Sequence, residues 1–234
     1  MTSSSLTALF RVRDRGSVSE EGYGMILLHS SEKRIKSIIR EINKSMKYSV
    51  RELSVCGMMA ALICVLAPVS LPLVSEVPIS LATLAVMLCG VLLGRNLGTL
   101  AVLIYIVLGA IGLPVFAGWS SGLGIILGVT GGYIIGYLPL AWISGYFNEK
   151  FGRSCKGAAK YAVLTGGMTL GNAVLYLIGT IWFIKATGMG LAASMSVCVI
   201  PFIPGDLIKT AVVAVLAERL ESVSDAVLRR SAAR

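Results

Sequence analysis

The chain has 234 residues, of which 56% are hydrophobic and only 14% are charged. Soluble domains carry about 25% charged residues, so this composition argues against a soluble globular protein and indicates an integral membrane protein. The formal net charge is +9, but Lys and Arg form short clusters between apolar stretches. That arrangement argues against a nucleic-acid surface and is typical of the charge bias that orients a membrane protein in the lipid bilayer.

Residues 1–48 form an N-terminal extension that differs from the rest of the chain. Its first 31 residues are rich in Ser, Gly and Arg, show no periodicity, and lack the apolar core of a signal peptide. Between Ser31 and Met46, isoleucines recur at helical spacing among basic residues, which predicts a basic amphipathic helix on the inner membrane surface. The alternative is that translation starts at Met46 and that the extension is an artefact of the assigned start.

Six apolar segments follow and predict an all-α integral membrane protein with a six-transmembrane-helix bundle in residues 49–220. The second segment is shorter than the roughly 20 residues of a spanning helix, so we expect it to be tilted or only partly spanning. Residues 221–234 are expected to form a cytoplasmic tail. The predicted segments are Leu53–Ala67, Leu81–Leu93, Leu97–Leu113, Gly131–Phe147, Tyr161–Ile184 and Leu191–Leu220.

The first segment carries small residues at helical spacing, namely Gly57, Ala60, Ala61 and Cys64. Small side chains let helix backbones approach closely in lipid, so this stripe is a candidate docking surface for a partner helix. Packing within the bundle is the alternative explanation for such a stripe.

The stretch Pro114–Thr130 is apolar but rich in glycine. Its backbone groups would lack partners in lipid, so we expect a loop that folds back and caps the outward side of the bundle.

The basic residues predict the orientation. If the N-terminus is cytoplasmic, the basic clusters near Arg51, Arg95, Lys150 and Arg219 all face inward, and Lys185 alone remains outside. A multi-pass protein of the cell (inner) membrane with both termini in the cytoplasm is therefore expected.

Asp206 and Lys209 form the clearest ionisable pair inside the apolar segments. One isolated charge at mid-membrane costs ~2.5–3.5 kcal/mol, whereas a pair at i and i+3 lies on one helical face and neutralises itself. Pro201, Pro204 and Gly205 predict a helix break that places Asp206 in the first turn of a new helix, where free amides favour a carboxylate. The pair complements a cyclic urea, among many other polar ligands; a purely structural ion pair is the alternative.

Other side chains are candidates for the same site. Asn172 offers a donor and an acceptor, and Tyr176 follows one turn later on the same face; an interhelical hydrogen bond explains Asn172 equally well. Thr130 precedes two glycines, where a sharp turn would present backbone amides to an anion. Aromatic residues that wall an apolar pocket, or alternatively form an interfacial belt, are Trp119, Tyr133 and Tyr137.

The sequence gives little support for an enzyme. Gly118–Gly122 fits the G-x-S-x-G pattern of hydrolases, but the one histidine, His29, lies in the extension, and only Lys209 remains as a base. The five cysteines lack metal-ligand spacing, so we expect neither a metal nor a cofactor. No phosphate-binding G-x-x-x-x-G-K-[ST] motif occurs, so the chain does not power transport with ATP itself.

Five motifs in order along residues 49–218 resemble the BioY family of biotin transporters. They are Val77–Gly94, Leu108–Gly118, Gly128–Gly136, Gly171–Trp182 and Pro204–Lys209.

The resemblance implies biotin uptake by the substrate-binding S component of an energy-coupling factor (ECF) transporter. The implied partners are biotin, a membrane coupling subunit and two ATPase subunits. The resemblance also implies that Asp206 and Lys209 contact the ligand, with Asn172 and Tyr176 nearby and the turn Thr130–Tyr133 as pocket wall. One departure is Ala82, where many family members have Gln; if that Gln contacts the ligand, another group takes its role here.

Three other interpretations remain open at this stage. The same architecture could carry another vitamin, or the chain could be a stand-alone biotin carrier without ATPase partners. An intramembrane hydrolase is the alternative from a different class, with Ser120 as its nucleophile.

Overall fold

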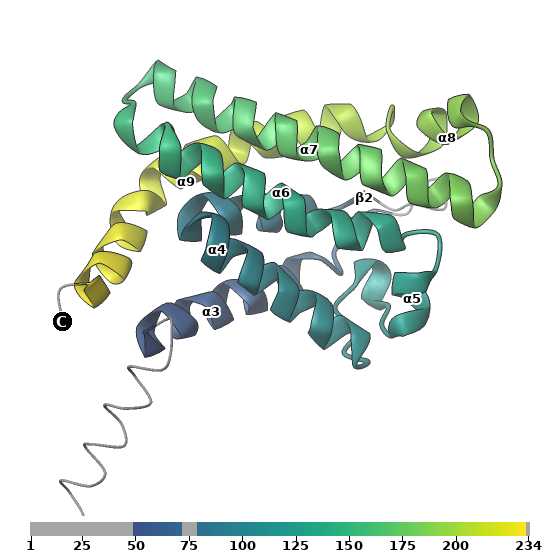
Figure 1. Ribbon diagram of the computed structural model, residues 1–234, viewed down its shortest axis with the longest axis horizontal. Helices are drawn as coiled ribbons and strands as arrows, with labels where there is room; N and C mark the ends of the chain where they lie inside the picture. Colours follow the sequence, from purple (N-terminus) through teal and green to yellow (C-terminus); the bar gives the residue numbers. More distant parts are fainter. Residues whose placement is uncertain (1–48, 72–78, 233–234) are drawn as a thin grey trace, which may run out of the picture. The chain divides into compact units, whose positions relative to one another are not determined.

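The computed structural model describes residues 49–71 and 79–232, so the predicted N-terminal extension with its amphipathic helix lies outside the described residues (Figure 1). Residues Val50–Arg234 form one compact unit. Its described part is almost entirely helical, as predicted. The elements are α3 (Val50–Leu66), β1 (Ser70–Leu71), β2 (Ile79–Ser80), α4 (Ala82–Ala110), η1 (Ala117–Trp119), α5 (Leu123–Leu127), α6 (Gly131–Lys150), η2 (Gly152–Ser154), α7 (Ala158–Thr187), α8 (Leu191–Cys198) and α9 (Phe202–Ala232).

Helix α4 contains two of the predicted apolar segments and reverses direction between them. The reversal occurs at Gly94, whose φ of 79° and ψ of 176° are not helical. A Cβ atom on Gly98 would lie 2.8 Å from the Cα atom of Gly90. In a straight helix these residues would be separated by a rise of about 12 Å, so the two arms of α4 lie side by side.

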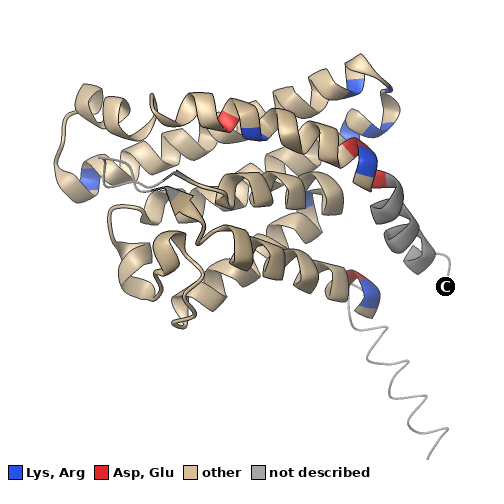
Figure 2. Cartoon of the chain, turned by 180° about the vertical axis from the view of Figure 1, so that it is seen from behind, with Lys and Arg blue, Asp and Glu red and all other residues tan. Residues whose placement is uncertain are grey.

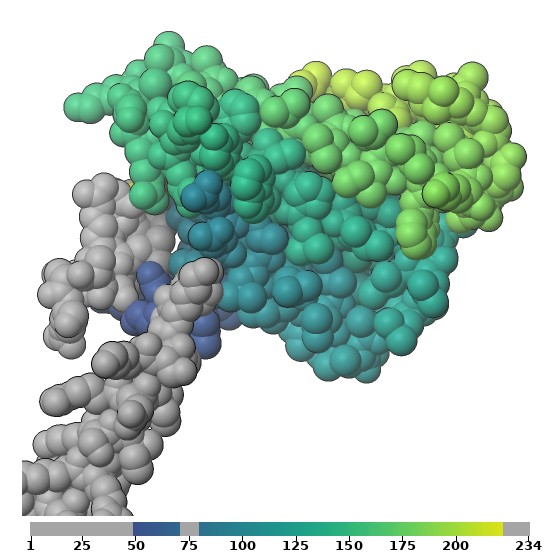
Figure 3. All heavy atoms as spheres, in the orientation of Figure 1, coloured from purple at the N-terminus to yellow at the C-terminus, as the bar shows by residue number. Residues whose placement is uncertain are grey.

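Helix α6 packs against α4 on one side and α7 on the other, and glycines allow the backbones to approach. A Cβ atom on Gly145 would lie 2.5 Å from the backbone nitrogen of Arg95, and one on Gly90 would lie 2.4 Å from the carbonyl oxygen of Ala141. In the space-filling view the atoms of α6 and α7 meet along the face shown (Figure 3). Small residues therefore hold these apolar helices at close distance, as is typical of membrane proteins.

The predicted last segment, Leu191–Leu220, is two helices rather than one. Helices α8 and α9 meet at a bend of 45°. Because α9 begins at Phe202, Pro204 lies in its first turn, where proline is tolerated, and Asp206 lies in the second turn. The prediction that Asp206 occupies the first turn of a new helix was therefore wrong by about one residue.

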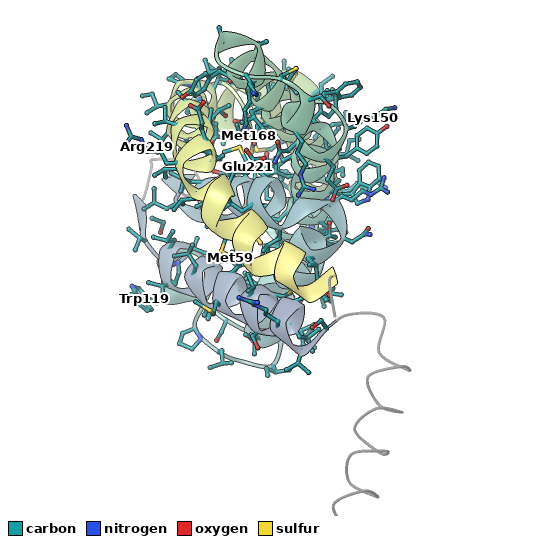
Figure 4. The ribbon with its side chains drawn as sticks, turned by 90° about the vertical axis from the view of Figure 1, so that its left-hand side faces the viewer. Met59, Trp119, Lys150, Met168, Arg219 and Glu221 are labelled. Carbon is teal, nitrogen blue, oxygen red and sulfur yellow. The ribbon has the colours of Figure 1, made fainter. Side chains whose placement is uncertain are left out.

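The far end of α9 is tied to its neighbours by polar side chains. Glu221 forms an ion pair with Lys160, and Tyr161 donates a hydrogen bond to Glu218. The side-chain amide of Asn148 on α6 also donates to Glu221, at 3.5 Å. In Figure 4 Glu221 points inward, whereas Arg219 points away from the helices. Helix α9 continues to Ala232, so the predicted tail begins inside a helix.

The described helices, counted one by one, do not confirm the six predicted spans. Seven α-helices lie in residues 49–71 and 79–232, and α5 and α8 have only 5 and 8 residues. By length and hydropathy, two described helices, α4 and α7, qualify as spans, and the bent pair α8 and α9 is a third. Helix α3 has only 17 residues, and α4 combines two predicted segments, so a count by single helices does not give six.

The predicted glycine-rich loop contains η1 and α5, and protein groups satisfy much of its backbone. The amide of Gly118 donates to the carbonyl oxygen of Pro68 at 3.2 Å, and the amide of Gly122 donates to that of Gly109 at 2.8 Å. The ring of Phe116 is buried against Gly109, where an added Cβ would lie 2.1 Å from the ring. Segment 114–130 is therefore attached to the end of α4 and to the segment after α3.

The close approach at Gly145 makes a testable prediction. We expect Gly145→Ala to push α4 and α6 apart, because the added methyl group would meet backbone atoms, and to lower stability by about 1–3 kcal/mol. Gly166→Ala on α7 is the matched control, because nothing lies within 4 Å of its added Cβ. Thermal unfolding in detergent compares the two variants, and equal melting temperatures would contradict the packing described.

Candidate ligand-binding site

A buried ion pair lies in the second and third turns of α9. The ammonium Nζ of Lys209 is 2.9 Å from Oδ1 of Asp206. The two residues are only 8% and 5% exposed. In Figure 2 most charged residues gather near one end of the described helices, and an isolated red and blue pair lies away from them. The prediction that the two charges face inward and neutralise each other is confirmed.

Three segments supply the remaining partners of this pair. The hydroxyl of Thr83, at the start of α4, donates to Oδ1 of Asp206 at 3.1 Å and accepts from Lys209 at 3.0 Å. Lys209 also donates to the carbonyl oxygen of Ser80 at 2.8 Å. Tyr176 on α7 donates to Oδ2 of Asp206. An ammonium has three donors, so Lys209 is fully satisfied.

The partners of Asp206 differ in kind from those predicted. We expected free backbone amides at a helix start, but the donors are two hydroxyl groups and one ammonium. The reason is the position of Asp206, which lies past the first turn, where the amides are already bonded along the helix.

One cavity, here the Ser80 cavity, has a volume of about 320 Å³, near the lower end for small-molecule sites. Ser80 connects it to the ion pair, because its carbonyl oxygen accepts from Lys209. Ala82 also lines this cavity, so the position at which the resemblance to the BioY family implies Gln faces the same space. Its aromatic walls are Tyr105, Phe116, Tyr133 and Tyr137.

Thr130 and Tyr133 line the Ser80 cavity, as the predicted pocket wall requires. The hydroxyl of Tyr133 donates to the carbonyl oxygen of Cys198 at 3.3 Å, which fixes the ring at the wall. The amide of Gly131 donates to the carbonyl oxygen of Gly128 at 3.1 Å. That amide is therefore already bonded, which weakens the expectation that this turn presents free amides to an anion.

The second cavity, here the Asn172 cavity, has a volume of about 230 Å³ and lies between α7 and α9. Asn172, Tyr176 and Asp206 all line it. The amide nitrogen of Asn172 is 3.6 Å from the sulfur of Met87, and its amide oxygen is buried without a hydrogen-bond partner. The structure thus brings Asn172 and Tyr176 beside the ion pair and leaves an unused acceptor there.

Trp119 and Lys209 are the two predicted ligand-binding residues that line neither cavity; Lys209 reaches the Ser80 cavity only through the carbonyl oxygen of Ser80, whereas Trp119 has no such link. Trp119 is 67% exposed and lies at the edge of the side-chain view (Figure 4). Its position in η1 turns the ring away while the neighbouring residues Ala117 and Ser120 line the Ser80 cavity.

Two contributors to the site were not identified from residue chemistry. They are the hydroxyl of Thr83 and the carbonyl oxygen of Ser80, which lie 123 and 129 residues from their partners in α9. The only signal was that Thr83 belongs to the second-span motif that resembles the BioY family.

The predicted docking stripe on α3 divides between two environments. Ala60 is buried and Cys64 is half-buried, whereas Gly57 and Ala61 are exposed. Nothing lies within 4 Å of a Cβ atom added to Gly57. Only part of the stripe is therefore open to a partner helix.

The chain is an apolar helical bundle that buries an ion pair beside two cavities. These features define a membrane protein with a polar binding site. The family model described as the BioY family matches residues 40–226, so the chain belongs to the BioY family. It is accordingly a membrane transport protein and not an enzyme.

Three similar proteins show the extent of the match. The chain is 40% identical to the probable biotin transporter BioY of Pyrococcus horikoshii, covering 73% of this chain and 96% of that one. It is 36% identical to the biotin transporter BioY of Thermotoga maritima, covering 74% and 98%. A crystal structure at 2.1 Å of the S-component for biotin from an ECF-type ABC transporter matches with a TM-score of 0.68 and 31% identity, covering 74% of this chain and 92% of that one.

The bridging role of Thr83 makes a prediction about stability. Thr83→Val keeps the shape of the side chain but removes the hydroxyl that bonds both charges, so we expect a loss of about 1–2 kcal/mol. Thr83→Ser keeps the hydroxyl and should unfold close to the wild type. Thermal unfolding in detergent measures both variants. A valine variant as stable as the serine variant would show that the hydroxyl does not support the pair.

Proposed function

We propose that the chain captures biotin as the S component of an ECF transporter. The observation that carries this proposal is the buried pair of Asp206 and Lys209, in which an acceptor and a donor lie side by side. A cyclic urea offers two N–H donors and one carbonyl acceptor, which complement a carboxylate and an ammonium. The names of the relatives from Pyrococcus horikoshii and Thermotoga maritima support the choice of biotin.

Binding exchanges hydrogen bonds rather than creating them from unpaired groups. Lys209 would give up one of its protein acceptors, such as the carbonyl oxygen of Ser80, for the carbonyl oxygen of the ligand. Asp206 would accept an N–H group of the ligand. The apolar frame would then lie in the Ser80 cavity against Tyr105, Phe116 and Tyr133. An apolar guest would gain none of these hydrogen bonds to the pair.

The proposal includes six spans with both termini in the cytoplasm. The reversal at Gly94 supports a count of α4 as two spans, so that α3, the two arms of α4, α6, α7 and the pair α8 and α9 make six. The basic residues at one end of the helices support a cytoplasmic location of that end (Figure 2). Segment 114–130 then lies on the outward side as a cap over the Ser80 cavity.

The proposed partners are a membrane coupling subunit and two ATPase subunits. The exposed residues Gly57 and Ala61 on α3 support a docking surface, because a helix with small side chains lets another helix approach closely.

Biotin retention by purified protein tests the ligand. We expect Asp206→Asn to weaken binding by about tenfold or more, because the variant loses a charge-assisted hydrogen bond to an N–H group. The measurement is retention of labelled biotin in detergent, with thermal unfolding to confirm that the variant is folded. Glu149→Gln is the control, since Glu149 pairs with Arg95 outside both cavities.

The result for wild type decides the cargo. Retention of biotin in preference to other vitamins supports the proposal, whereas preference for another vitamin would assign a different cargo to the same fold. Equal biotin retention by wild type and a folded Asp206→Asn variant would contradict the assigned residues.

The docking surface has its own prediction. We expect Gly57→Leu to leave biotin retention unchanged, because a Cβ atom added there has no described atom within 4 Å, but to reduce uptake in cells that contain the coupling subunits. Gly166→Leu, at an equally open position on α7, should keep uptake. Uptake by the Gly57 variant at the wild-type level would exclude this face as the docking surface.

A further inference from the structure

A cluster of aromatic and basic side chains lies on one face of α6, outside both cavities. Trp142, Tyr146 and Lys150 follow at intervals of four residues and therefore share a helical face. The rings of Trp142 and Tyr146 stack at 5.3 Å with an angle of 4° between their planes. The ammonium of Lys150 donates to the hydroxyl of Tyr146 at 2.9 Å, and Arg95 lies 5.7 Å from the centre of the same ring.

The charge of Lys150 has no carboxylate partner in the described part of the chain. Glu149, the adjacent residue, pairs with Arg95 instead, at 3.3 Å. Lys150 lies 5.4 Å from the ring centres of both Tyr146 and Phe151, so aromatic rings hold it in place. Among residues 49–71 and 79–232 one of its three donors is used, by the hydroxyl of Tyr146, and two remain for an anion.

The cluster places a cationic group at one end and apolar rings further along the helix, which matches the charged headgroup and the apolar chains of a phospholipid. Lys150 ends α6 and points away from the helices in Figure 4, whereas Trp142 lies two turns earlier, about 12 Å along the helix axis. Trp142 is 43% exposed and Phe151 is 42% exposed. Aromatic side chains lie at membrane interfaces, and basic residues beside the bilayer attract anionic headgroups.

From this arrangement we propose that Trp142, Tyr146 and Lys150 form a binding site for an anionic phospholipid. The headgroup phosphate accepts hydrogen bonds from the remaining donors of Lys150, and an acyl chain lies along the exposed ring of Trp142 and the half-buried ring of Tyr146. Glu149 neutralises Arg95, so the positive charge of the site comes from Lys150, which has no carboxylate partner among the residues that the structure describes. This site shares no residue with the proposed biotin site and does not depend on it.

Lipid-dependent thermal unfolding of the full chain in detergent tests the proposal. Phosphatidylglycerol should raise the melting temperature of wild type, whereas phosphatidylcholine with the same acyl chains and inorganic phosphate should give little shift. Lys150→Gln should lose most of the phosphatidylglycerol shift, and Lys150→Arg should keep it. Lys185→Gln, which removes an exposed lysine near the C-terminal end of α7, should respond as wild type does.

Several results would overturn the proposal. An equal shift with phosphatidylcholine would mean that the headgroup charge is not recognised, and an equal shift with inorganic phosphate would mean that the lipid chain does not contribute. An unchanged phosphatidylglycerol shift in Lys150→Gln would exclude Lys150 as the contact. The wild-type measurements with phosphatidylglycerol, phosphatidylcholine and inorganic phosphate test the proposal even where a variant fails to fold.

Discussion

Two opposite charges enclosed by apolar helices impose the constraint on which the rest of this structure depends. A lone charge in lipid costs ~2.5–3.5 kcal/mol, so Asp206 and Lys209 need polar partners as well as each other. Thr83 and Ser80 come from the start of α4, and Tyr176 comes from α7. The same segments line the two cavities: Asp206 itself lines the Asn172 cavity, and Ser80, whose carbonyl oxygen accepts from Lys209, lines the Ser80 cavity.

Close helix packing makes this convergence possible. The reversal of α4 at Gly94 allows both arms of the helix to pack in the bundle, and Gly145 lets α6 lie against the backbone at that reversal. The side-chain amide of Asn148 donates to the carbonyl oxygen of Val91 at 2.9 Å, next to the break in α4. Glycine and one buried amide thus stabilise the turn that brings Thr83 toward α9.

The sequence predicted the features that depend on local spacing. Hydropathy located the apolar segments, and the i, i+3 spacing placed Asp206 and Lys209 on one face. The contact with Thr83 was not predictable from spacing, because 123 residues separate it from Asp206. The start of α9 was misplaced because proline is accepted in a first helical turn. The spacing of apolar residues does not show which side of a short turn faces a cavity. The prediction that Trp119 lines a pocket therefore missed its exposed position.

A crystal structure of the chain with bound biotin would show whether the ion pair recognises the ligand. We expect the ureido ring to lie within hydrogen-bond distance of both Asp206 and Lys209, with Lys209 released from at least one of its present acceptors. Biotin bound away from the pair, with every hydrogen bond of Asp206 and Lys209 unchanged, would contradict it.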